Sequence, residues 1–131
     1  MKYNNLMKKY KIFIFSFLII LILLNFKIVR IQGNSMSPTL ENGSFALADK
    51  YLHKLFTIHK DNILLLEVDG KEVVKKIVGF PGEKIVIEDK IIKLQNNEIF
   101  VLGENLPESI DSREYGPLKV TNITGKIVLS F

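Results

Sequence analysis

The sequence predicts a mostly β protein, in which a small domain of short antiparallel strands follows one N-terminal membrane-spanning helix. Three observations predict it. An uncharged apolar run fills Ile12–Phe26, valine and isoleucine dominate shorter runs after residue 30, and Gly, Pro, Asp or Asn separates those runs. β-Branched residues favour strands, and nothing after residue 30 keeps a helical period. The 131 residues allow one modest domain.

The first element is expected to be a membrane anchor at residues 12–29, after a basic segment at residues 1–11. Extending the run from Tyr10 to Val29 gives twenty positions, and a helix of that length spans about 30 Å, the thickness of a bilayer core. The alternative is a cleaved secretory signal, which ends in small residues. The exit here reads NFKIVRIQGNS and has no such pair directly after the apolar run, which favours a retained anchor.

The distribution of basic residues predicts the orientation of this anchor in the cell membrane. More lysines precede the run than follow it closely, which favours a cytoplasmic N-terminus and an exported domain at residues 30–131. The basic residues in question are Lys2, Lys8, Lys9 and Lys11 before the run, and Lys27 and Arg30 after it. The lipid bilayer is therefore an expected partner.

Seven strands are expected in the remaining chain. EVDGKEVV predicts a hairpin, because Asp69-Gly70 joins two β-rich segments. VIEDKIIKLQNNEIFVL predicts two further hairpin connections, at Glu88-Asp89 and at Asn96-Asn97. The expected strands are Phe45–Ala48, Ile63–Val68, Lys71–Val78, Lys84–Glu88, Ile91–Leu94, Ile99–Leu102 and Lys126–Leu129.

Composition argues against several classes of function. The net charge of +4 comes partly from the N-terminal lysines, and no basic stripe with interleaved aromatic residues follows, so a nucleic-acid partner is not expected. The chain has no cysteine, which excludes disulfides and a thiol nucleophile. No His/Asp/Glu cluster has convincing metal-ligand spacing. We therefore expect neither a metal nor a cofactor.

The stretch GNSMSPTL contains Ser35, a candidate nucleophile that needs a base to take its proton. The two histidines, His53 and His59, lie in a polar stretch with no pattern that relates them to a serine. A lysine can act as the base if burial keeps its amine neutral, although at pH 7 an ordinary lysine is only about 0.04% neutral. Lys75-Lys76 lies among valines and isoleucines, and alternation along a strand turns one of the two inward.

Three ordered segments together resemble the type I signal peptidases, membrane-bound Ser/Lys proteases that remove signal peptides. The segments are SMSPTL, then VVKKIVGFPGE forty residues after Ser35, then LGENLPESIDSREYGPL. The resemblance, closest to the short single-anchor Gram-positive form, implies a serine endopeptidase with a β-domain of that type and signal-peptide-bearing preproteins as substrates. By position, Ser35 matches the nucleophile, Lys75 the general base, Ser109 the serine that orients the lysine, and Asp111 and Arg113 the pair that braces the site.

The chain departs from the family pattern at several positions. Lys76 and Glu104 fall where the family usually has arginine and aspartate, so we expect a contact between them of altered geometry. Gly33 falls where some members carry a serine hydroxyl that assists the oxyanion, which leaves the N–H of Ser35 as the main donor, with that of Gly33 or a water assisting. Shallow pockets for small substrate side chains at positions −1 and −3 are expected at Ile31, Met36, Leu40 and Val74.

Two other classes of protein are compatible with parts of this pattern. Self-cleaving SOS-response repressors share the Ser/Lys pair, but they carry a DNA-binding domain ahead of the serine and lack the SPTL and SIDSR segments. A non-catalytic, membrane-anchored surface or assembly protein could retain the same fold. Loss of Ser35 or Lys75 would favour that alternative, and both residues are present.

Overall fold

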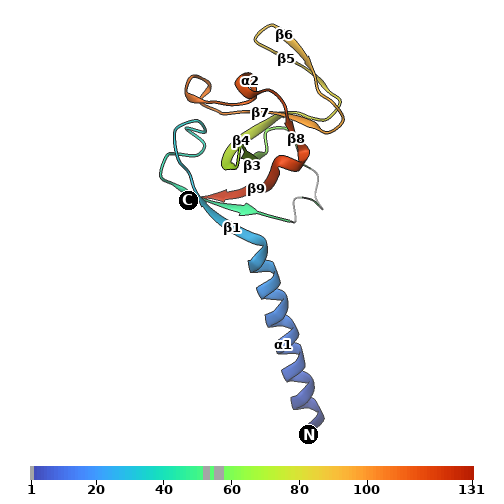
Figure 1. Ribbon diagram of the computed structural model, residues 1–131. Coiled ribbons are helices and arrows are strands. Elements are labelled where there is room, and N and C mark those ends of the chain that lie inside the picture. The colour runs from blue at the N-terminus through green and yellow to red at the C-terminus, as the bar shows by residue number, and fades with distance from the viewer. Residues whose placement is uncertain (1, 52–53, 55–57) are drawn as a thin grey trace.

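The computed structural model describes residues 2–51, 54 and 58–131, and in it one long helix leads into a β domain (Figure 1). The prediction of a mostly antiparallel β domain is confirmed. The helices are α1 (Lys2–Asn25) and α2 (Ser112–Tyr115), and the strands are β1 (Phe26–Arg30), β2 (Phe45–Asp49), β3 (Ile63–Val68), β4 (Lys71–Gly79), β5 (Lys84–Ile87), β6 (Lys90–Lys93), β7 (Glu98–Leu102), β8 (Leu118–Lys119) and β9 (Ile123–Ser130).

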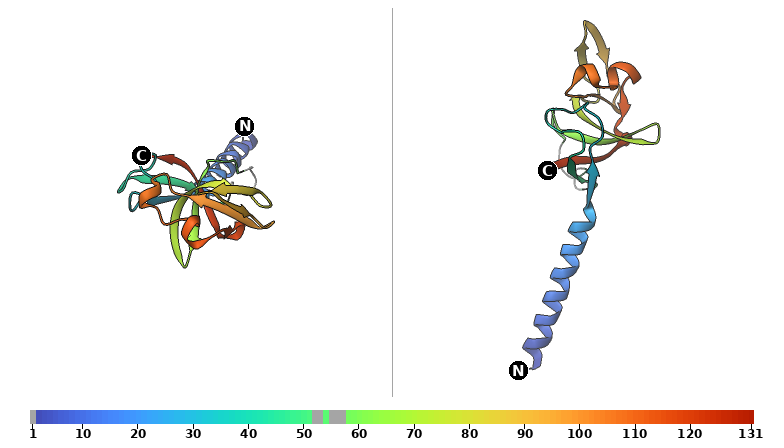
Figure 2. Two further views of the ribbon diagram at one scale, coloured as in Figure 1. Left: turned by 90° about the horizontal axis from the view of Figure 1, so that it is seen from above. Right: turned by 90° about the vertical axis from the view of Figure 1, so that its left-hand side faces the viewer.

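Helix α1 extends away from the β domain, as a second direction of view also shows (Figure 2). The predicted anchor at residues 12–29 is wrong at its C-terminal end, because residues 26–29 belong to β1. The β-branched Ile28 and Val29 continue the apolar run in sequence but favour a strand, and the whole of β1 pairs with β2. Among the described residues, no helix is both long and apolar enough to cross a membrane.

The main sheet has the strand order β1-β2-β9-β3-β4-β7-β8, and β5 and β6 form a separate two-stranded sheet. Two of the three predicted hairpins are confirmed, at Asp69-Gly70 and Glu88-Asp89. The residues of both turns have positive φ, between 48° and 74°, which suits the tight connection of twisted strands. The third prediction is wrong: the Asn96-Asn97 turn follows β6, but β6 pairs with β5 whereas β7 pairs with β4 and β8.

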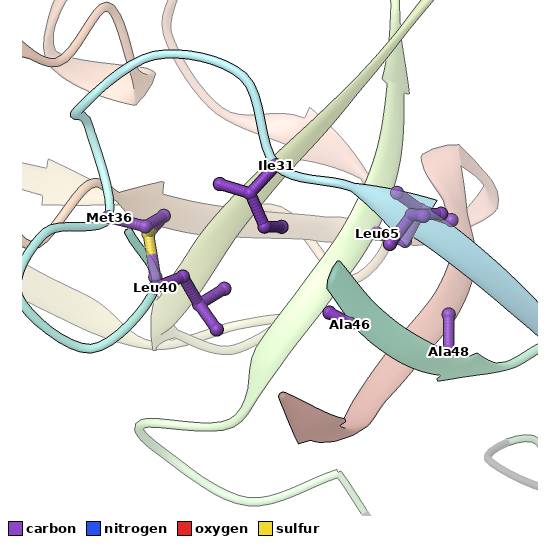
Figure 3. Close-up of a cluster of buried hydrophobic side chains, with 7 residues drawn as sticks. Ile31, Met36, Leu40, Ala46, Ala48 and Leu65 are labelled. Carbon is purple, nitrogen blue, oxygen red and sulfur yellow. The ribbon is translucent and has the colours of Figure 1, made fainter. Parts of the chain in front are cut away.

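The sheet curls so that β1 approaches β4, although β2, β9 and β3 lie between them in strand order. Lys27 of β1 contacts Glu72 of β4, and Ser35, which follows β1, contacts Lys75. A buried apolar cluster lies inside this curl (Figure 3). Its members are Val29, Ile31, Met36, Leu40, Ala46, Ala48 and Leu65, and a second cluster of Leu64, Leu66, Ile77, Ile99 and Val101 packs around β3, β4 and β7.

Candidate active site

Strand β4 turns its two adjacent lysines to opposite sides. Lys75 is 5% exposed, whereas Lys76 is half-buried. Alternation along the strand predicted this division, and the structure shows that Lys75 is the inward residue. Burial without a carboxylate in direct contact is the environment that disfavours an ammonium group.

The turn after β1 places Ser35 beside this lysine. Met36 and Leu40 are both buried in the cluster under the turn, and the Leu40 N–H donates to the Met36 carbonyl at 2.8 Å. The Asn105 N–H donates to the carbonyl oxygen of Ser35 at 3.0 Å. The serine is therefore held from two directions, by apolar packing below the turn and by the chain after β7.

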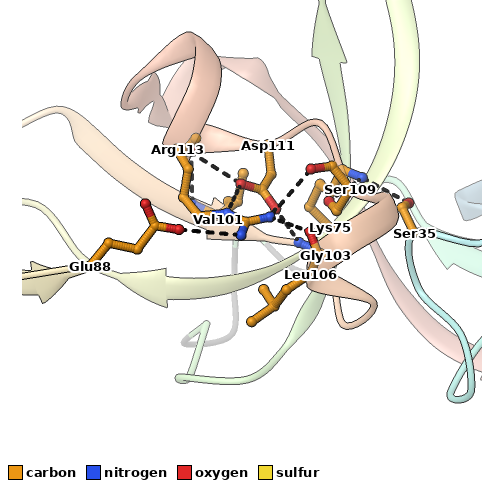
Figure 4. A network of polar contacts seen from close by, with 10 residues as sticks. Ser35, Lys75, Glu88, Val101, Gly103, Leu106, Ser109, Asp111 and Arg113 are labelled. Carbon is orange, nitrogen blue, oxygen red and sulfur yellow. Dashed lines mark hydrogen bonds and ion pairs between the residues drawn. The ribbon is translucent and has the colours of Figure 1, made fainter.

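Lys75 Nζ lies between two hydroxyl groups (Figure 4). It is 2.8 Å from Ser35 Oγ and 3.1 Å from Ser109 Oγ. Burial lowers the pKa of Lys75; the Asp111 carboxylate acts in the opposite direction without reversing the shift, and the Arg113 guanidinium lowers the pKa further. The site therefore holds a serine hydroxyl against an amine that loses its proton more readily than an ordinary lysine does.

Asp111 and Arg113 hold the segment that carries Ser109, the second hydroxyl partner of Lys75 (Figure 4). Asp111 is fully buried and accepts hydrogen bonds from the Gly103 N–H at 3.0 Å and from Arg113 Nε at 2.9 Å. Burial raises the pKa of Asp111, but hydrogen bonds from Arg113, Gly103 and the Ser109 hydroxyl outweigh it, so the net pKa is lowered. The guanidinium also donates to the carbonyl oxygens of Leu106 and Ser109, which fixes the segment that carries Ser109.

Gly103 is a site residue that the sequence reasoning missed. A Cβ at this position would lie inside van der Waals contact with Ser109 Oγ and with the Ser35 carbonyl oxygen. Only glycine lets the chain after β7 pass this close to both segments. The signal was present in LGEN, where the glycine precedes Glu104 of the quoted motif.

The expected contact between Lys76 and Glu104 is present. Lys76 Nζ lies 2.6 Å from a Glu104 carboxylate oxygen, and the Thr39 hydroxyl donates to the same carboxylate. Hydrogen bonds from Lys76 and then from Thr39 lower the pKa of Glu104. Glu104 therefore joins β4 to the segment after Ser35, a link that requires Thr39, which the sequence reasoning did not single out.

A groove of about 820 Å³ passes the Ser35–Lys75 pair. Three of the four residues expected to form substrate pockets, Ile31, Met36 and Val74, line it. The expectation for Leu40 is wrong: this side chain is 2% exposed, packs in the cluster under the serine turn and is not part of the groove lining. Its role is to hold the turn.

Comparison with known proteins places the chain in a family. The model of the family described as "Signal peptidase, peptidase S26" matches residues 5–98 and 90–131. The chain belongs to the peptidase S26 family. It is 28% identical to signal peptidase I V of Bacillus subtilis, over 75% of this chain and 81% of that protein. It is 33% identical to mitochondrial inner membrane protease subunit 1 of Schizosaccharomyces pombe, over 79% of this chain and 71% of that protein. The corresponding subunit of Xenopus tropicalis is 30% identical, over 79% of this chain and 67% of that protein.

Within this signal-peptidase site, Gly33 contributes backbone geometry. Its φ is 83°, a conformation that suits glycine, and its N–H donates to Asn42 Oδ1 at 3.0 Å. The expectation that the Gly33 N–H assists an oxyanion is therefore wrong, because that donor is already used. The N–H of Ser35 has no hydrogen-bond partner within the described part of the chain.

The other candidate bases and ligands lie elsewhere. The backbone N–H of His59 donates to Asn62 Oδ1 just before β3, and His59 is not among the residues that line the groove. His53 lies outside the described residues. Among residues 2–51, 54 and 58–131, no group of three or more His, Cys, Asp or Glu side chains could hold a metal ion.

Proposed function

We propose that this peptidase S26 chain is a membrane-attached serine endopeptidase that removes N-terminal signal peptides from exported preproteins, with Ser35 as nucleophile and Lys75 as general base. The observation that carries the proposal is the 2.8 Å separation between Ser35 Oγ and Lys75 Nζ, with Lys75 5% exposed and the pKa of its amine lowered by burial. A nucleophile within hydrogen-bond reach of an amine that can be neutral is what a Ser/Lys hydrolase requires.

The hydrogen bonds behind the amine favour the correct direction of proton transfer. The oxygen of Ser109 accepts an N–H from Lys75 at 3.1 Å, and its hydroxyl lowers the pKa of the anionic Asp111, which assigns the Ser109 O–H to that carboxylate. The lone pair of the neutral amine is then available to the Ser35 O–H on its other side. Ser109 and Asp111 thus act as positioning residues, and the neutral hydroxyl between Lys75 and the carboxylate keeps an anion out of direct contact with the amine.

The reaction follows from these positions. Ser35 Oγ attacks the carbonyl carbon of the substrate residue at position −1, and its proton passes to Lys75 Nζ. The tetrahedral intermediate expels the amine of position +1, which takes that proton from the Lys75 ammonium and leaves an acyl ester on Ser35. Lys75 then takes a proton from a water that attacks the ester, and returns it to Ser35 Oγ. The N–H of Ser35, which has no partner among the described residues, is the donor we assign to the oxyanion.

The substrate is expected to bind as an extended strand in the groove. In the described sheet, β1 pairs with β2 alone, and residues 71–74 of β4 pair with β3 alone. Both strands border the groove, so each presents an edge whose backbone groups can pair with an added strand. Ile31, Met36 and Val74 form apolar walls beside Ser35, which suits small side chains at positions −1 and −3.

Helix α1 supports attachment to a lipid bilayer. Its side chains from Ile12 to Leu24 are apolar apart from Ser16, and the large ones are 40–71% exposed, an arrangement that is unfavourable in water. We expect the chain to stay in the membrane fraction after alkaline carbonate washing, and release into the supernatant would contradict this. The predicted extracytoplasmic side of the β domain stays a prediction; digestion of that domain by protease added to intact spheroplasts would support it.

The test of the chemistry is cleavage of a preprotein with an Ala-x-Ala site by detergent-solubilised protein. We expect Ser35→Ala and Lys75→Ala each to abolish cleavage, whereas Ser37→Ala, in the same turn, serves as the matched control and keeps it. The folded state of each variant is checked by circular dichroism. A wild-type chain that cleaves no such substrate would favour the non-catalytic surface or assembly protein instead.

A further inference from the structure

An ion pair crosses the groove at a distance from the catalytic pair. Lys27 Nζ of β1 lies 2.6 Å and 2.7 Å from the two carboxylate oxygens of Glu72 on β4. Both residues line the groove. The sheet order separates β1 from β4, so the pair links two strand edges that no backbone ladder joins. An extended chain that lies between those edges must meet this contact.

The position of the pair along the groove follows from strand geometry. Residues that alternate along a strand share a face, so Lys27, Val29 and Ile31 of the β1 segment point to one side, and Glu72 and Val74 of β4 share another. Glu72 lies about 7 Å before Val74 along β4. The ion pair therefore stands beyond the apolar walls that flank Ser35, towards α1, and on the β4 side the groove lining continues past it to Lys71 and Asp69.

We propose that the Lys27–Glu72 ion pair is a specificity determinant that limits how far the substrate extends in the groove on the N-terminal side of the cleaved bond. This inference rests on the proposed function, because the orientation follows from small side chains at −1 and −3 beside Ile31 and Val74. At about 3.4 Å per residue, an extended substrate reaches the pair near position −5. Earlier substrate residues must break the ion pair or leave the groove.

The ion pair favours some substrates over others only weakly. Its side chains are 42% and 43% exposed, and exposed ion pairs contribute weakly, so a substrate that breaks this one loses about two- to fivefold in affinity. The contribution falls further as salt screens the two charges. A preprotein whose extended segment before the cut is short avoids this loss, and one with a longer extended segment does not.

The experiment measures peptide binding in a Ser35→Ala background, so that cleavage does not enter the readout. Two labelled peptides share an Ala-x-Ala site; one begins at about position −4 and the other at about position −10, and fluorescence anisotropy gives both Kd values. Glu72→Gln is expected to improve the affinity for the long peptide relative to the short one by about two- to fivefold. Raising salt from about 0.05 M to about 0.5 M should improve the affinity for the long peptide relative to the short one by the same factor when Glu72 is present. In Glu72→Gln the same change in salt should alter this ratio little.

Two controls identify the pair as the cause. Glu67→Gln removes the same charge from the residue that pairs with Glu72 across β3 and β4, outside the groove lining, and should leave the ratio of affinities unchanged. The charge exchange Lys27→Glu with Glu72→Lys should restore the wild-type ratio. An unchanged ratio in Glu72→Gln, an equal change in Glu67→Gln, or failure of either peptide to bind would overturn the inference. Wild-type protein that binds both peptides and cleaves neither would reject the proposed function alone.

Discussion

The two faces of β4 give identical, adjacent residues different environments. Lys75 faces inward, is 5% exposed, and meets the hydroxyls of Ser35 and Ser109. Lys76 faces the other way, is half-buried, and meets the Glu104 carboxylate at 2.6 Å. The difference lies in the partners: neutral hydroxyls leave a buried amine free to lose its proton, whereas a carboxylate forms an ion pair with an ammonium. One lysine is suited to be a base and the other to join segments.

The strongest way to break this comparison is to replace each lysine with arginine. Lys75→Arg should lower kcat/KM by about 10²–10⁴, because a guanidinium stays protonated and cannot accept the Ser35 proton. Lys76→Arg keeps a cation beside Glu104 and should stay within about threefold of the wild type. The measurement is kcat/KM on a signal-peptide substrate. An active Lys75→Arg would rule out Lys75 as the base, and a collapse in Lys76→Arg alone would give that role to Lys76.

The pH dependence of activity sharpens the same contrast. The mechanism needs neutral Lys75, and burial lowers its pKa, so kcat/KM should rise with pH through a value below the ordinary lysine pKa near 10.4. Below the lowered pKa of Lys75 the amine carries a proton, and activity is lost. His53→Ala and His59→Ala should keep the same profile. A profile that shifts or collapses in either histidine variant would contradict the lysine base.

Much of the fold was predictable because strands with clear boundaries carry local signals. Ile63–Val68 was predicted with its observed bounds, and the Asp69-Gly70 turn identified its hairpin partner. Strand β1 was not predicted, since Ile28 and Val29 continue an apolar run and only pairing with β2 distinguishes strand from helix there. The two-residue β8 is too short to show a period of two. The false hairpin at Asn96-Asn97 shows that a turn signal does not identify the strand that pairs next.

For the site, the sequence supplied the residue types and the structure supplied the distances. The patterns placed Ser35 and Lys75 among the candidates, but alternation alone could not choose between Lys75 and Lys76. Leu40 was predicted to be a pocket residue because apolar side chains near a nucleophile can serve either packing or binding, and only the groove lining, which includes Met36 but not the equally buried Leu40, decides between them. Gly103 was missed because the motif LGEN shows that a glycine is present but does not show that Ser109 and the Ser35 carbonyl pass close to it.

Substitution of Gly103 tests whether the site on the Lys75 side of β4 depends on the close approach of the chain after β7. Gly103→Ala should lower stability by about 1–3 kcal/mol through overpacking against Ser109 and the Ser35 carbonyl. The added Cβ displaces Ser109, whose hydroxyl holds Lys75. The variant should therefore also lower kcat by about tenfold or more, the loss expected for one hydrogen bond to a charged group. Gly70→Ala is the matched control, since its positive φ costs about 1–2 kcal/mol, a Cβ there meets open space, and Gly70 itself does not line the groove. Equal activity in the two variants, compared at the same folded fraction, would contradict the close-approach argument.

The smallest expected effect concerns the outward face, where Glu104→Gln removes the carboxylate beside Lys76. Hydrogen bonds from Lys76 and Thr39 lower the pKa of Glu104 in the folded state, so the folded chain binds this proton less readily than the unfolded chain. The stabilisation is therefore fully present above the unfolded pKa near 4.3 and is lost as pH falls through the lowered folded pKa.

Glu104→Gln should lower the midpoint of thermal unfolding by a few degrees at pH 7, roughly 1 kcal/mol, and by progressively less as the pH falls below about 4. Glu67→Gln removes an exposed carboxylate on β3 and, as the control, should change the stability at pH 7 by no more than about 0.5 kcal/mol. If the Glu104→Gln deficit is as large at pH 3 as at pH 7, the charge of Glu104 does not stabilise this face, and the packing of its side chain must account for the link between β4 and the serine segment.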